Sequence, residues 1–167
     1  MNQDMTQDAH DPALDDLAAS VARRASARGC TVAVAESLTG GMVAAALARA
    51  EGASEWFRGG IVAYASEVKY GLLDVPDGPV VSRPAARAMA RRARELLGAG
   101  LVVAVTGSGG PDPQDGESPG TVFVAVAGEP GGDDVFRLDL DGTPAEICTS
   151  AAAEVLRVLA TRLGPSP

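Results

Sequence analysis

Three short segments of the sequence carry the side chains that could do chemistry. Residues 36–41 hold Ser37 beside two glycines at a predicted helix start, a second segment holds Tyr64 and Lys69, and residues 106–111 form a Gly-rich loop. Each segment follows a predicted strand, and open α/β sheets bind ligands where their strands end. A hydroxyl, an ionisable amine and unpaired backbone N–H groups are components of nucleophilic catalysis on a carbonyl group.

Ser37 is the candidate nucleophile. Unpaired N–H groups at a helix start can bind an anion or an oxyanion, so the Ser37 hydroxyl would lie beside such a site. Alternatively, Ser37 or Thr39 only caps the helix. The sequence around Ser37 is not the G-x-S-x-G elbow, because Ala35 and Thr39 occupy the glycine positions. The single histidine, His10, lies in a polar tail, which argues against a Ser–His–Asp mechanism.

Lys69 is the only lysine in the chain, and all other basic residues except His10 are arginines. A lysine acts as a general base only when neutral, and its reference pKa of ~10.4 must then be lowered by burial or a nearby cation. The alternative is a solvated helix residue. Residues 66–69 also match S-x-x-K, but the S-D-N and K-T-G elements that accompany it are absent. We therefore expect Ser66 to be only a helix cap.

The loop at residues 106–111 is neither G-x-G-x-x-G nor a Walker A motif. Its backbone N–H groups could approach a phosphate or a carboxamide, or the loop could be a flexible surface turn. The two cysteines, Cys30 and Cys148, form no zinc pattern and are expected to be small buried hydrophobes. We expect no metal.

Composition narrows the class of protein. The 167 residues fit one domain, which we expect over residues 12–164 after a disordered tail at residues 1–11. The net charge of −8 and the aromatic content of 4% argue against nucleic-acid binding. The sequence shows no signal peptide and no apolar run long enough to span a membrane, so we expect a cytoplasmic protein without a membrane partner.

Periodicity predicts an α/β fold with a mostly parallel sheet that helices cover on both faces. The expected strands are Cys30–Ala35, Phe57–Tyr64, Leu101–Val105, Thr121–Ala127 and an antiparallel edge strand, Asp134–Leu140. The expected helices are Pro12–Ala27, Met42–Ala50, Ser66–Leu73, Arg83–Leu97 and Thr143–Leu163. We expect Asp11, Ser82 and Thr143 to be helix caps.

Four linked motifs give the chain a family resemblance. They are A-E-S-x-T-G-G at residues 35–41, G-x-V-x-Y-x-x-E-x-K at 60–69, T-G-x-x-G-P at 106–111 and P-G-T-V at 119–122. With their order and spacing, the sequence resembles the CinA C-terminal domain family from about Leu14 to Leu163. The resemblance implies a three-layer α/β/α sandwich, often a homodimer, that deamidates nicotinamide mononucleotide to nicotinic acid mononucleotide and ammonia without a cofactor.

The resemblance also implies roles for individual residues. Ser37 would be the nucleophile, Lys69 and Tyr64 would carry its proton, and Thr106 would support the site. We expect the nucleotide substrate to contact the two glycine-containing segments, at Glu36, Thr39, Gly40, Gly41, Gly107, Gly109 and Gly110. Many family members carry two arginines in a G-D-R-x-x-V-R segment, where this sequence has Pro144 and Cys148. The alternatives are a diverged member that binds a nucleotide or small phosphate ligand with little or no hydrolysis, and an interaction module.

Overall fold

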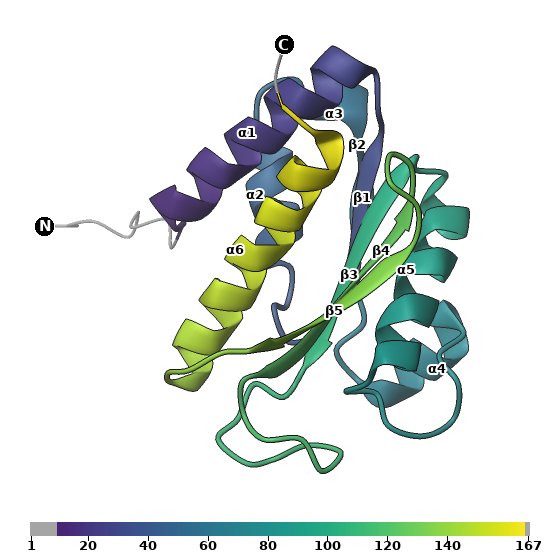
Figure 1. The fold of residues 1–167 in the computed structure, drawn as a ribbon, viewed down its shortest axis with the longest axis vertical. Helices are drawn as coiled ribbons and strands as arrows, with labels where there is room; N and C mark the ends of the chain where they lie inside the picture. Colours follow the sequence, from purple (N-terminus) through teal and green to yellow (C-terminus); the bar gives the residue numbers. More distant parts are fainter. Residues whose placement is uncertain (1–9, 166–167) are drawn as a thin grey trace, which may run out of the picture.

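The computed structural model describes residues 10–165. Within this range the chain forms, in order, α1 (Pro12–Arg28), β1 (Val32–Glu36), α2 (Met42–Arg49), α3 (Ala53–Trp56), β2 (Phe57–Val62), α4 (Ser66–Leu73), α5 (Arg83–Leu97), β3 (Leu101–Gly107), β4 (Thr121–Gly128), β5 (Asp134–Asp139) and α6 (Pro144–Leu163). Figure 1 shows one twisted sheet between two groups of helices. Most of the expected tail, residues 1–9, lies outside the described residues.

The sheet of the described chain has five strands in the order β2-β1-β3-β4-β5. β1 is parallel to both β2 and β3, whereas β4 is antiparallel to β3 and to β5. The prediction of an α/β fold with a mixed sheet and an antiparallel edge strand is confirmed, but the expectation that β4 is parallel is wrong. A parallel pair needs a crossover, usually a helix, and the chain between β3 and β4 supplies only a loop, so β4 returns alongside β3 in the opposite direction.

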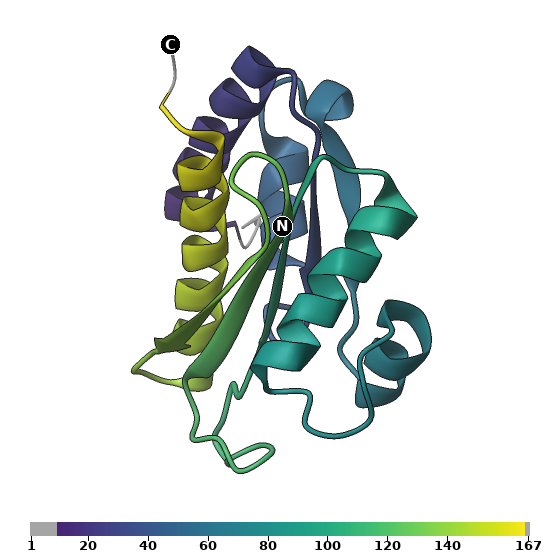
Figure 2. The same cartoon turned by 45° about the vertical axis from the view of Figure 1, so that its right-hand side comes forward.

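Two hydrophobic cores lie on opposite faces of the sheet, because successive side chains of a strand point to opposite sides. On one face, residues such as Val103 and Val124 pack against α1, α2 and α6. On the other face, smaller residues such as Ala104 and Ala125 pack against α5, whose buried side chains are also mostly alanines. Figure 2 shows α5 and α4 on one side of the sheet and α1 and α6 on the other. The molecule is therefore a three-layer sandwich.

Side-chain caps explain where the three longest helices, α1, α5 and α6, begin. The Asp11 carboxylate accepts a hydrogen bond from Ala13 N at 2.9 Å, and Ser82 Oγ accepts one from Ala85 N at 3.2 Å, so both predicted caps are confirmed. Thr143 caps α6 as predicted. The predicted Ser66 cap is wrong, because Ala65 takes the cap position of α4 and Ser66 is the first helical residue. The short helix α3 was not predicted, since four residues are too few to show a helical period.

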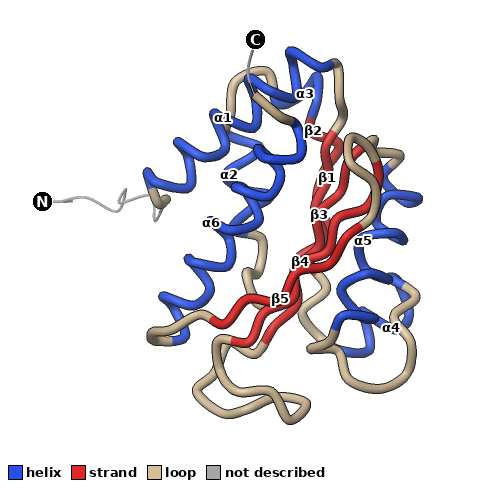
Figure 3. The backbone as a smooth tube through the Cα atoms, viewed as in Figure 1, coloured by secondary structure: helices blue, strands red, loops and turns tan. Residues whose placement is uncertain are grey.

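The parallel strands β1 and β3 end at the same edge of the sheet, where the loops after them meet (Figure 3). The segments at residues 37–41, 63–65 and 108–120 follow β1, β2 and β3 directly. The topology therefore gathers the three segments singled out from the sequence. None of the helices between residues 10 and 165 has both the length and the apolar character that crossing a bilayer requires.

Candidate active site

A pocket of about 260 Å³ opens at this edge of the sheet. It brings together five of the predicted site residues, which are Ser37, Tyr64, Gly107, Gly109 and Gly110. The remaining walls are Leu38, Asp112, Gln114, Pro144 and Cys148. The other predicted residues lie outside the lining, namely Glu36, Thr39, Gly40, Gly41, Lys69 and Thr106.

Ser37 stands directly after β1, and its backbone is fixed on both sides. Its N–H donates to Val105 O of β3 at 3.1 Å, and its carbonyl accepts from Gly40 N at 3.0 Å, which closes a tight turn. The side chain is 7% exposed and lines the pocket. Among residues 10–165 no hydrogen bond engages Ser37 Oγ, so this hydroxyl is available to a ligand.

The start of α2 is filled by the protein's own carboxylate. Glu36 is fully buried and accepts hydrogen bonds from Thr39 Oγ1 at 2.7 Å, Val43 N at 3.0 Å and Ala44 N at 2.9 Å. Glu36 and Thr39 thus bond to each other. Glu36 also accepts from N–H groups at the start of α2, where the sequence predicted an oxyanion-binding site, so these groups are not available to a substrate. The turn nearer to Ser37 still holds donors, because the N–H groups of Leu38 and Thr39 have no partner within the described chain.

Lys69 does not line the pocket, but it is bonded to Tyr64, which does. Its side chain is 1% exposed, and Nζ donates to Tyr64 O at 2.8 Å. Burial lowers the pKa of Lys69, and the nearby carboxylates of Asp115 and Glu67 partly oppose this shift. No hydrogen bond in the described chain joins Lys69 to Ser37. Tyr64 connects the two, since it lines the pocket with Ser37 and its carbonyl holds the amine.

Sequence reasoning missed Asp115 as a supporting residue. Its carboxylate accepts hydrogen bonds from Val80 N at 2.8 Å and Val81 N at 3.0 Å, and it lies near enough to Lys69 to affect the lysine's pKa. Thr106 Oγ1 donates to Val80 O at 2.8 Å, so Thr106 and Asp115 hold the same segment before α5. The only sequence signal was the Asp-Gly pair at residues 115–116 in a long loop, which predicts a turn rather than a contact.

Tyr64 and the glycine loop both line the pocket. The Tyr64 side chain is 72% exposed and lies at the rim. A Cβ atom at Gly107 would lie 2.8 Å from Val122 Cγ2 and 2.9 Å from Thr121 O. The glycine therefore allows the end of β3 to pack closely on β4, which fixes where the loop after it lines the pocket.

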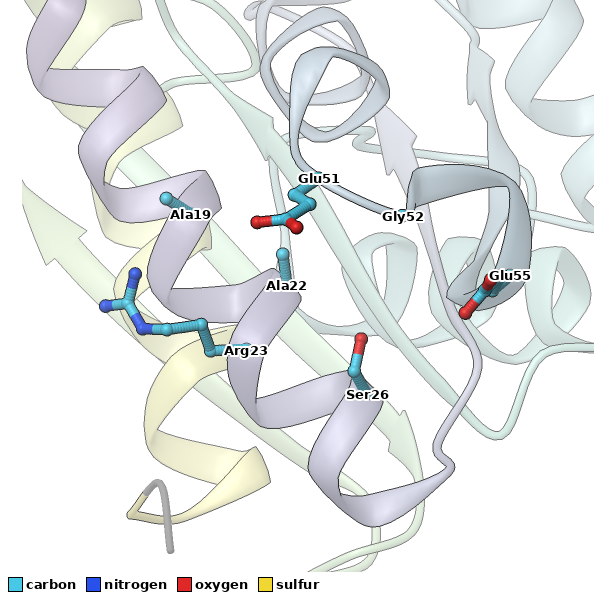
Figure 4. Close-up of a pocket in the computed structure, with 7 residues that line it drawn as sticks. All are labelled: Ala19, Ala22, Arg23, Ser26, Glu51, Gly52 and Glu55. Carbon is cyan, nitrogen blue, oxygen red and sulfur yellow. The ribbon is translucent and has the colours of Figure 1, made fainter.

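A larger pocket of about 400 Å³ lies elsewhere, between α1 and the segment that includes α3. Ala19, Ala22, Arg23, Ser26, Glu51, Gly52 and Glu55 line it. Figure 4 shows the Arg23 guanidinium pointing away from both glutamates. Because the polar groups of this larger pocket do not converge on one point, the pocket is a weaker candidate for an active site than the pocket at Ser37.

The fold and the pocket define an α/β protein with a serine-lined site where parallel strands end, backed by a buried lysine. A model of the family described as the CinA C-terminal domain matches residues 14–163, and the chain belongs to that family. A CinA-like protein of Frankia casuarinae is 41% identical over 145 residues, which are 84% of this chain and 33% of the relative. A CinA-like protein of Gemmatimonas aurantiaca is 46% identical over 118 residues, which are 67% of this chain and 28% of the relative. The chain thus spans a third or less of these curated relatives.

Solved structures agree with this assignment. The crystal structure of the competence damage-inducible protein A from Klebsiella pneumoniae has a TM-score of 0.85 and 31% identity, and the match covers 90% of this chain and 96% of that one. The crystal structure of a competence-damaged protein (CinA) superfamily protein from Enterobacter cloacae also has a TM-score of 0.85, with 25% identity over 98% of this chain and 99% of that one. These two solved chains, unlike the two curated relatives, match this chain over nearly their whole length.

Proposed function

We propose that this protein is an amidohydrolase that converts nicotinamide mononucleotide to nicotinic acid mononucleotide and ammonia. The observation that carries the proposal is the placement of Ser37 Oγ. This hydroxyl faces the pocket with no partner in the described chain, while a buried amine with a lowered pKa lies behind the adjacent wall. Membership of the CinA C-terminal domain family supports the same chemistry.

In this mechanism Ser37 Oγ attacks the carboxamide carbon, and its proton passes to the neutral amine of Lys69. For this step the amine leaves Tyr64 O, or the proton reaches it through the Tyr64 hydroxyl. The N–H groups of Leu38 and Thr39 stabilise the tetrahedral oxyanion. As the C–N bond breaks, the Lys69 ammonium returns the proton to the leaving nitrogen, and ammonia departs from a Ser37 ester.

Water then hydrolyses the ester with Lys69 again acting as the base. The products are the carboxylic acid and the regenerated Ser37 hydroxyl, so every proton is accounted for without a metal or a cofactor. Thr106 acts indirectly, because it holds the backbone of the segment before α5 to which Asp115 also binds. Asp115 lies near Lys69 and favours its charged form.

Ammonia release from nicotinamide mononucleotide tests the proposal directly. Ser37→Ala should reduce kcat by ~10⁴-fold or more, as loss of a serine nucleophile does elsewhere. Lys69→Arg should be similarly impaired, because a guanidinium keeps the charge but cannot act as a base near neutral pH. Ser66→Ala is the matched control, since it removes the serine of the literal S-x-x-K motif and should retain activity. Full activity in Ser37→Ala would exclude the covalent route.

One observation favours a second function, namely that Lys69 bonds to Tyr64 O rather than to Ser37. A protein that keeps this arrangement with ligand bound would hold a nucleotide or small phosphate ligand without hydrolysing it. Calorimetry with nicotinamide mononucleotide, run beside the ammonia assay, separates the two functions. Binding without ammonia release by the wild type supports the second.

A further inference from the structure

The turn between β1 and α2 holds both backbone donors assigned to the oxyanion. Ser37 O accepts from Gly40 N at 3.0 Å, so residues 37–40 form a β-turn with Leu38 and Thr39 at its centre. Neither central residue has a positive φ, whereas the type II turn and the mirror-image turns each require one. The turn is therefore type I, and its helix-like backbone points the free N–H groups of Leu38 and Thr39 in one direction.

One hydrogen bond from another element holds the central peptide of this turn. That peptide joins the Leu38 carbonyl to the Thr39 N–H, and because it is planar and trans, the two groups point in opposite directions. Cys148 Sγ of α6 donates to Leu38 O at 3.2 Å, and this carbonyl has no other partner within residues 10–165. Fixing Leu38 O therefore also fixes the direction of Thr39 N–H.

Cys148 suits this task because its thiol stays protonated. Burial raises the pKa of Cys148, so the S–H group remains a donor at neutral pH. The Cys148 side chain lines the pocket together with Ser37 and Leu38. The Ser37 hydroxyl in this pocket is 7% exposed and has no partner in the described chain. The turn that Cys148 holds is therefore the turn that a bound substrate would contact.

Without the thiol, the central peptide of the turn is free to rotate. A full rotation gives a type II turn, in which Thr39 N–H points away from Leu38 N–H and Thr39 takes a positive φ. A β-branched residue such as Thr39 strongly disfavours a positive φ. We therefore expect loss of the thiol to tilt the peptide rather than invert it, which weakens one oxyanion donor and leaves the other in place.

We propose that Cys148 is a positioning residue, whose S–H group holds the peptide between Leu38 and Thr39 so that Thr39 N–H is aligned with the oxyanion. This inference rests on the proposed amide hydrolysis and adds to it a residue that acts through the backbone of the turn. Because the oxyanion forms only as the carbonyl is attacked, the alignment contributes to kcat rather than to substrate binding.

The test compares Cys148→Ala with Cys148→Ser, which have side chains of nearly equal size and differ in whether a donor is present. Cys148→Ala should lower kcat for ammonia release from nicotinamide mononucleotide by roughly tenfold and leave KM within about twofold, because complete loss of an oxyanion donor costs about 10²–10³-fold and this donor is only misaligned. Cys148→Ser should restore kcat to within about threefold of the wild type, because its hydroxyl can donate to Leu38 O. Cys30→Ala is the matched control, because Cys30 Sγ bonds to Thr31 O and Glu129 O outside the pocket and its loss should leave kcat unchanged.

A second measurement does not depend on activity and follows the Thr39 backbone amide by NMR. The chemical shift of this amide should change in Cys148→Ala and return close to the wild-type value in Cys148→Ser. If the wild type releases no ammonia, the hydrolysis proposal fails, and this pattern of amide shifts alone still supports the positioning role of Cys148.

Any of three results would overturn the inference. One is a Thr39 amide shift that is unchanged in Cys148→Ala or changes as much in Cys148→Ser. Another, in an active protein, is a kcat that Cys148→Ala does not lower or that Cys148→Ser does not restore. The third is a loss confined to KM, because that pattern indicates contact with the bound substrate rather than alignment of a donor.

Discussion

Replacing Glu36 by glutamine should destabilise the fold and leave the chemistry nearly intact. The carboxylate is fully buried and accepts three hydrogen bonds, from the Thr39 hydroxyl and from two N–H groups of α2. A glutamine side chain at this position keeps one acceptor oxygen but turns an NH₂ group toward at least one donor. One charge-assisted bond is worth about 1.5–3 kcal/mol, and a buried donor left unpaired costs ~1–3 kcal/mol. Allowing for partial relaxation, we expect a loss of ~2–4 kcal/mol.

Thermal unfolding measures this loss. In a protein of this size, 1 kcal/mol shifts Tm by ~2–4 °C, so a loss of ~2–4 kcal/mol in Glu36→Gln should lower Tm by about 4–16 °C. Glu55→Gln is the matched control, because it makes the same exchange at an exposed position of α3 and should change stability by less than ~0.5 kcal/mol. A Thr39→Val variant combined with Glu36→Gln should lose less stability than the sum of the single variants, since both remove the same 2.7 Å bond.

Two results would refute the capping role of Glu36. One is a Tm within ~2 °C of the wild type, which would mean that the three hydrogen bonds contribute little. The other is a loss of kcat/KM of ~100-fold or more with little change in Tm, because that pattern indicates contact with the reacting substrate. The expected pattern, with Tm lowered and kcat/KM at low temperature nearly unchanged, separates structural support from substrate binding.

Three further predictions follow from the contacts of the site. Burial lowers the pKa of Lys69 and the neutral amine is the base, so kcat/KM should rise as pH increases through this lowered pKa. The cost in folding stability of burying the ammonium should disappear as pH rises from the lowered pKa to the ordinary pKa of lysine. A kcat/KM that falls as pH rises through this range would contradict the role of Lys69 as base. Asp115→Asn removes a charge that favours the ammonium, so it should move the kcat/KM profile to lower pH, and an unmoved profile would mean that Asp115 acts only on the backbone. Gly107→Ala should cost ~1–3 kcal/mol in chemical denaturation because its Cβ would lie 2.8 Å from Val122 Cγ2, whereas Gly71→Ala, with nothing within 4 Å, should be neutral or slightly stabilising; equal effects would contradict the packing role.

Short-range sequence signals predicted the elements of the fold well. The bounds of α5 were predicted as observed, because Ser82 and the proline that follows give a local start signal and Gly98 gives a local stop. The direction of β4 was predicted wrongly, since it depends on how the chain returns after β3 rather than on the residues of the strand. In the same way, Ala65 rather than Ser66 caps α4, a difference of one residue that local patterns do not resolve.

The candidate site could be predicted only in part. The motifs marked Ser37 and the glycine loop, and the topology brings them into one pocket. The partners of buried polar groups were beyond the sequence, because Glu36 finds its donors in α2 and Thr106 finds its acceptor at Val80, 26 residues earlier. The position of Lys69 against Tyr64 O depends on a rotamer, which no spacing rule specifies. Residue types were therefore easier to infer than their contacts.

Because Lys69 is buried, its rate of chemical modification can measure local opening of the structure around it. As the only lysine of the chain, Lys69 provides the only ε-amine for acylating reagents such as N-hydroxysuccinimide esters, and it is 1% exposed. Lys69 should acylate only when the surrounding structure loosens. The rate of Lys69 acylation, followed by mass spectrometry of the peptide that contains it, would then measure how often the interior behind the pocket admits a reagent, without any engineered label.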